Sequence, residues 1–134
     1  NSTLEPCMLD ISPFLLDKQK KALGEHNVSY REEDFLETDP AFLEGFDLVV
    51  LNENLGDFPT LVGLNEGLLR SSSGIADPIL RSALHFFTRY DLEKPEGVFN
   101  LNIGALQAIE RLCAAGIPYI IWVSTAAKLL STNR

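Results

Sequence analysis

Acidic and amide side chains follow three predicted strands of this sequence, each at the point where the strand ends. They are Asp10 after residues 7–9, Asp34 after 28–33, and Asn52 with Glu53 after 46–51. Ligands of open α/β sheets bind at the carboxyl ends of strands, where loops converge. A carboxylate there presents two acceptor oxygens to the hydroxyls of a ribose. In Asp34-Phe35, the carboxylate can accept a hydrogen bond from the exocyclic amine of a nucleotide base, and the aromatic ring can pack against the base. The pattern therefore favours nucleotide binding.

Each of these residues also has a purely structural interpretation. Asp10 and Asp34 are residue types common in turns and helix caps, and Asn52 is a common turn former beside a solvated Glu53. The succession of such residues at the ends of successive strands favours the binding interpretation. Both interpretations stay open on the sequence alone.

The elements around these residues predict an α/β fold. Expected strands cover 7–10, 28–33, 46–51 and 117–123, and expected helices cover 13–23, 79–90 and 102–115, with a short helical turn between Asp39-Pro40 and Gly45. The near-continuous Leu and Val of 46–51 predict a parallel strand buried on both faces. Between 60 and 77 we expect a helix end and then a mobile Ser/Gly loop, and over 125–134 a short fraying helix. The order predicts one domain, 1–134, with a doubly wound, mostly parallel sheet and helices on both faces.

The expected helices begin with recognisable signals. Ser12 before Pro13 and Asp77 before Pro78 combine a capping side chain with proline at the first helical position, and Asn102 can cap the helix that follows it. In the first of these helices one face collects the residues at helical spacing, which are Leu15, Leu16, Gln19, Ala22 and Leu23.

Composition excludes several classes of partner. The 134 residues are 46% apolar and 22% charged, with a net charge of −8 and a pI near 4.6. A chain this acidic lacks the basic surface with which proteins bind the phosphates of nucleic acids, and it is not attracted to an anionic membrane. No apolar run approaches the roughly 20 residues that span a bilayer. Cys7 and Cys113 lack metal-ligand spacing, and we expect buried thiols in a reducing compartment, the cytoplasm.

Two motifs resemble class I S-adenosylmethionine-dependent methyltransferases, and within them the MidA-like family, which includes the mitochondrial complex I assembly methyltransferase. The first is Leu9-Asp10-Ile11-Ser12-Pro13, followed by a helix containing Leu, Gln and Lys. The second is Asn52-Glu53-Asn54-Leu55-Gly56-Asp57-Phe58-Pro59, which is similar to the family pattern Asn-Glu-x-Leu-Asp-Ala-x-Pro with its loop acid displaced by one residue. The resemblance covers about residues 9–60.

The resemblance implies a set of roles around S-adenosylmethionine. Asp10, with Ile11 beside it, would bind the ribose, and Asp34 with Phe35 would border the adenine. Asn52 and Glu53 would lie near the methionine end of the cofactor and the methyl acceptor, a protein arginine in the family. A carboxylate facing a guanidinium is physically sensible because a bidentate pair orients it for methyl transfer. A eukaryotic member would lie in the mitochondrial matrix.

One departure from the family concerns the cofactor loop. The family begins with a strand and a Gly-rich loop, whereas residues 1–6 contain no glycine. We expect either the middle of a longer protein, which is favoured because the chain does not begin with Met, or a chain without this loop. A sheet truncated in this way would expose an edge and favour self-association. Two alternatives stay open: a non-catalytic methyltransferase-like scaffold that binds a protein, and an unrelated α/β regulatory domain whose acidic strand ends bind Mg²⁺.

Overall fold

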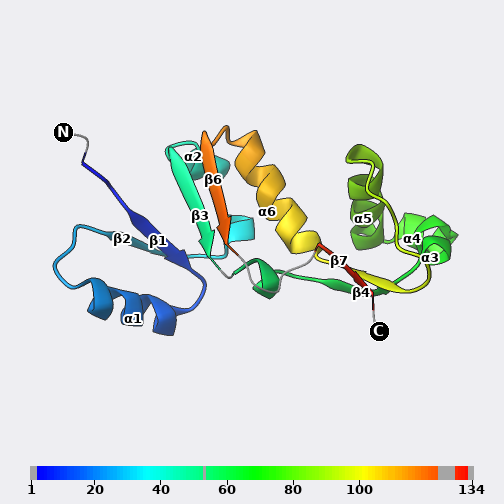
Figure 1. The fold of residues 1–134 in the computed structure, drawn as a ribbon, viewed down its shortest axis with the longest axis horizontal. Helices are drawn as coiled ribbons and strands as arrows, with labels where there is room; N and C mark the ends of the chain where they lie inside the picture. The colour runs from blue at the N-terminus through cyan, green and yellow to red at the C-terminus, as the bar shows by residue number, and fades with distance from the viewer. Residues whose placement is uncertain (1–2, 53, 124–128, 133–134) are drawn as a thin grey trace. The chain divides into compact units, whose positions relative to one another are not determined.

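A computed structural model describes residues 3–52, 54–123 and 129–132 and divides the chain into two compact units, 1–45 and 46–134 (Figure 1). The first unit contains β1 (Cys7–Asp10), α1 (Pro13–Leu23), β2 (Ser29–Glu32), the 3-10 turn η1 (Phe35–Glu37) and α2 (Pro40–Leu43). The second contains β3 (Leu48–Asn52), the 3-10 turn η2 (Leu55–Asp57), β4 (Leu61–Leu64), α3 (Glu66–Arg70), α4 (Ser72–Ala76), α5 (Pro78–Arg89), β5 (Phe99–Leu101), α6 (Ile103–Ala114), β6 (Tyr119–Val123) and β7 (Leu130–Thr132). The prediction of a single domain stays a prediction.

The first unit is a parallel pair of strands joined by a helix. β1 and β2 pair in parallel from Cys7–Ser29 to Asp10–Glu32, and α1 makes the crossover between them (Figure 1). Ser12 caps α1, since its Oγ accepts from the Leu15 amide at 3.3 Å, and Pro13 takes the first helical position. Gly24 ends the helix with φ +53°, a conformation that L side chains rarely adopt. The predicted strands and helix of this region are confirmed.

The second unit combines a parallel and an antiparallel sheet. β3 pairs in parallel with β6, from Leu48–Tyr119 to Asn52–Val123, and the order of the second sheet is β4-β5-β7, all antiparallel. The described chain is therefore mixed α/β, with small parallel and antiparallel sheets and helices. No helix among the described residues is long and apolar enough to cross a membrane.

The main core of the second unit lies where β4, α3, α5, β5 and the start of α6 meet. Its buried members are Leu64, Leu69, Ala83, Phe86, Phe87, Phe99, Leu101, Ile103 and Leu106. Phe99 is fully buried, and its ring lies 5.7 Å from that of Phe87 in an edge-to-face arrangement. The predicted helices over 79–90 and 102–115 supply this core through α5 and α6, so their existence is confirmed.

The region from 60 to 77 differs from the expected helix end and mobile loop. It forms β4, α3 and α4, and Gly63, with φ +70°, interrupts the pairing of β4 with β5. This irregularity hides the alternation by which a strand is recognised. The serine stretch is ordered by Ser71, whose Oγ donates to the Leu68 carbonyl at 2.7 Å and accepts from the Gly74 amide at 3.0 Å.

The prediction of a helix over 125–134 is also wrong where the structure describes this segment. Residues 124–128 and 133–134 lie outside the described ranges, but Leu130–Thr132 forms the strand β7. β7 pairs with β5, with Leu130 opposite Leu101. The physical reason is long-range pairing, which overrides the weak helical preference of so short a segment.

Two predictions of burial are wrong. β3 was expected to be buried on both faces, but only one face is well covered: Leu51 is buried, while Leu48 and Val50 are 45% and 53% exposed. Leu48 and Val50 alternate with Leu51 along the strand, so they lie on the opposite face of the sheet, and that face is exposed. Cys7 is partly buried, but Cys113 is exposed because it lies beside, and not on, the buried stripe of α6 that ends at Leu112.

A close contact links the loop after β3 to α6. The Gly104 amide donates to the Pro59 carbonyl at 2.9 Å. A Cβ at position 104 would lie 2.5 Å from Pro59 Cδ and 2.8 Å from Phe58 Cβ, so only glycine allows this approach. The Phe-Pro end of the Asn52–Pro59 motif is thereby held against the first turn of α6.

The phenol of Tyr90 is expected to lose its proton at a higher pH than an ordinary tyrosine does. Tyr90 Oη donates to Glu110 Oε2 at 2.7 Å, and this hydrogen bond, followed by desolvation and the Glu110 charge, raises the pKa of Tyr90 above its ordinary value. Glu110→Ala should lower that pKa, so in a titration followed by the ring signals of Tyr90 in NMR spectra its tyrosinate should form at lower pH. Because the pKa of Tyr90 is raised in the folded protein, the Tyr90–Glu110 hydrogen bond contributes to stability below the ordinary tyrosine pKa of about 10. This contribution is lost as the pH rises through the pKa of Tyr90 in the folded protein. An unchanged titration curve would contradict the assignment.

Candidate functional site

Asp10 and Asp34 end neighbouring parallel strands in the first unit. Asp10 is level with Glu32 in the β1–β2 register, and its carbonyl accepts from the Glu33 amide at 3.1 Å. Asp34 therefore lies two residues beyond the strand partner of Asp10, on the same edge of the sheet. Parallel pairing produces this arrangement, because it brings the carboxyl ends of both strands together.

The carboxylate of Asp10 is held at both oxygens. Oδ1 accepts from the Ser12 amide at 2.9 Å, and Oδ2 accepts from Gln19 Nε2 at 3.4 Å. Each carboxylate oxygen has a second lone pair, so both can still accept a ligand donor. The side chain is partly buried, and the adjacent Ile11 is 66% exposed. Asp10 thus serves as a turn residue and keeps acceptor capacity for a pair of hydroxyls.

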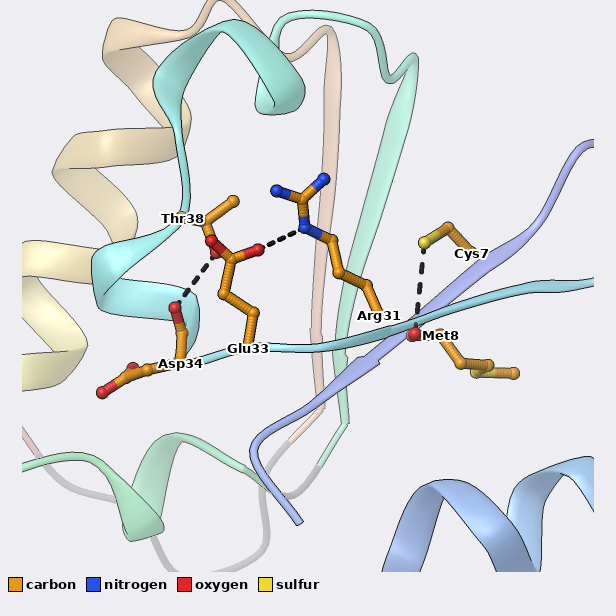
Figure 2. A network of polar contacts seen from close by, with 6 residues as sticks. All are labelled: Cys7, Met8, Arg31, Glu33, Asp34 and Thr38. Carbon is orange, nitrogen blue, oxygen red and sulfur yellow. Dashed lines mark hydrogen bonds and ion pairs between the residues drawn. The ribbon is translucent and has the colours of Figure 1, made fainter. Parts of the chain in front are cut away.

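Asp34 begins a tight turn that orders Phe35. Its Oδ1 caps η1 by accepting from the Leu36 amide at 2.9 Å, while its carbonyl accepts from Thr38 Oγ1 at 3.1 Å (Figure 2). Thr38 is fully buried, so this turn is anchored in the first unit. Oδ2 of Asp34 makes no hydrogen bond with the described residues, and Phe35 is partly buried. The turn therefore presents a carboxylate oxygen next to an aromatic ring.

The surroundings of this edge are acidic. Figure 2 shows Arg31 and Glu33 pointing toward one another, and Arg31 Nε donates to Glu33 Oε2. The guanidinium also lies 4.0 Å from the centre of the Phe42 ring. Arg31 is therefore engaged, while Asp10, Glu32 and Asp34 contribute negative charge to the strand ends. Such an edge attracts a cationic ligand and repels a phosphate.

The second predicted group belongs to the second unit. Asn52 is the exposed last residue of β3, at the carboxyl end of the β3–β6 parallel pair. Glu53 lies outside the described residues. The structure thus brings Asp10, Ile11, Asp34 and Phe35 into one unit and leaves Asn52 at an equivalent strand end in the other.

Gln19 is the residue of this site that sequence reasoning missed. Its position on the face of α1 that packs on the sheet made it a core candidate, but its amide contacts the Asp10 carboxylate. The available signal was an amide side chain on an otherwise apolar helical face. In the ranges that the structure describes, no three His, Cys, Asp or Glu side chains gather closely enough to hold a metal ion.

Comparison of the chain with protein-family models, curated proteins and solved structures finds no match to any of them. The assignment of a function therefore depends on the motifs of the chain and on the geometry of the strand ends.

Proposed function

We propose that this chain functions as an S-adenosylmethionine-dependent methyltransferase. The observation that carries the proposal is the pair of carboxylates at neighbouring parallel strand ends, Asp10 and Asp34, each with acceptor capacity left for a ligand. Asp10, with Ile11 beside it, would bind the ribose hydroxyls, and Asp34 with Phe35 would border the adenine. The bound cofactor would supply the methyl group.

Electrostatics favours this cofactor over other adenosine-containing ligands. S-adenosylmethionine carries an ammonium, a sulfonium and one carboxylate, so it is a net cation, and it has no phosphate. Dinucleotides and nucleoside phosphates would bring negative charge to an edge that already holds Asp10, Glu32 and Asp34, in a chain of net charge −8. Phosphate-binding sites use Gly-rich turns, helix N-termini or basic side chains instead.

The methyl acceptor is proposed to be a protein side chain such as arginine. Asn52, which ends β3, and Glu53, the next residue in the sequence, would face the acceptor, and a carboxylate could orient a guanidinium by two parallel hydrogen bonds. The proposal includes the doubly wound, Rossmann-like fold expected from the sequence, and the parallel pairing within each unit supports it.

The test is calorimetric titration with S-adenosylhomocysteine, the reaction product, which cannot turn over. We expect binding with a Kd on the order of micromolar, and no binding of AMP or NAD⁺ under the same conditions. Chemical-shift changes should fall on the backbone amides of Asp10–Ser12 and Asp34–Leu36. A folded chain that binds none of these ligands would contradict the proposal and favour a non-catalytic scaffold. Binding of AMP and S-adenosylhomocysteine alike would contradict the electrostatic argument.

A further inference from the structure

Gln19, on α1, contacts the carboxylate of Asp10, the proposed ribose-binding residue. Its Nε2 lies 3.4 Å from Asp10 Oδ2, and the Ser12 amide lies 2.9 Å from Oδ1. The Ser12 contact is made by the backbone and is available to any residue at position 12 except proline. The Gln19 contact is made by a side chain nine residues away from Asp10, so it depends on the identity of residue 19.

The orientation of the Gln19 amide follows from the chemistry of its partner. An ionised carboxylate only accepts hydrogen bonds, so the NH₂ end of the amide must face Asp10. This orientation leaves Gln19 Oε1 buried, with no donor in the part of the chain that the structure describes. An unpaired buried acceptor is unfavourable for folding. A leucine would also fit the packed face of α1 and would remove the unpaired acceptor, but it would leave Asp10 Oδ2 without its side-chain donor.

We infer that Gln19 is a positioning residue, which holds the carboxylate of Asp10 in the plane required to meet both ribose hydroxyls. The inference rests on the proposed function. With one oxygen tied to the Ser12 amide and the other to Gln19, rotation of the carboxylate about its Cβ–Cγ bond is restricted before the ligand arrives. Such preorganisation lowers the entropy lost on binding.

The test compares Gln19→Leu with a matched control, Gln107→Leu on α6, a second partly buried helical glutamine. Gln19→Leu should weaken S-adenosylhomocysteine binding about tenfold, the equivalent of one hydrogen bond. It should change the denaturation midpoint little, because the removal of the unpaired acceptor offsets the loss of the hydrogen bond to Asp10. Gln19→Glu keeps the shape but opposes two carboxylates, so it should weaken binding more. Gln107→Leu should bind as the original chain does. Binding by Gln19→Leu with unchanged affinity would overturn the inference.

A second readout does not depend on ligand binding. In ¹H–¹⁵N correlation spectra, Asp10→Ala should move the side-chain amide signals of Gln19 and leave those of Gln107 in place. If the original chain fails to bind S-adenosylhomocysteine, the proposed function is wrong, and this experiment still decides whether Gln19 holds Asp10. Gln19 signals that do not respond to Asp10→Ala would overturn the positioning role.

Discussion

Asp10→Ala should weaken the binding of S-adenosylhomocysteine about 100-fold. The substitution removes both acceptor oxygens, and two hydrogen bonds to a charged group at about 1.5 kcal/mol each amount to about a 100-fold loss of affinity. Calorimetric titration measures this loss directly. Asp17→Ala is the matched control, because Asp17 is an exposed acid on α1 whose Oδ2 lies 2.7 Å from Lys21 Nζ on the surface. It should bind as the original chain does.

Asp10→Asn separates the loss of the ligand contact from a loss of folding. The amide oxygen can still accept from the Ser12 amide, so the turn into α1 keeps its hydrogen bond. The variant should remain folded and bind at least tenfold more weakly, because one of the two acceptors becomes a donor. Retention of full affinity in folded Asp10→Asn and Asp10→Ala would remove Asp10 from the site.

Phe99→Ala should lower the free energy of unfolding by about 3–5 kcal/mol, the usual cost of deleting a buried aromatic ring. The ring is fully buried in the core of the second unit and packs edge-to-face on Phe87. Chemical denaturation followed by the fluorescence of Trp122, the only tryptophan, reports on this unit. Against a typical total stability of 5–15 kcal/mol, the loss is large.

The neighbouring residue supplies the control for Phe99. Val98 is 50% exposed, so Val98→Ala should change the unfolding free energy by no more than about 0.5 kcal/mol. Equal effects of the two substitutions would contradict the position of the core. Amide exchange in residues 3–45 of Phe99→Ala would also test the single-domain prediction, since one cooperative domain loses protection throughout the chain.

Local signals in the sequence were sufficient for α1, α5 and α6 and for the strands of the parallel pairs. Ser12, Asp77 and Asn102 each cap the helix expected after them, because capping depends on residues within one turn. The neighbouring positions of Asp10 and Asp34 were also predictable, since a strand–helix–strand unit is nearly always parallel and therefore aligns the carboxyl ends of its strands.

Tertiary structure decided the elements whose stabilising contacts are distant in sequence. β4, β5 and β7 have three or four residues each, and their hydrogen-bond partners lie about 30 or more residues away, so no local periodicity marks them. The exposure of Val50 depends on what packs against its face of the β3–β6 sheet, and that is decided by tertiary contacts. The candidate site also depends on both levels. The sequence alone determined that an acid, Asp10, ends β1. Only the packing of α1 on that strand brought the Gln19 amide to the Asp10 carboxylate, because the rotation of the helix and the position of the strand together set which side chains meet.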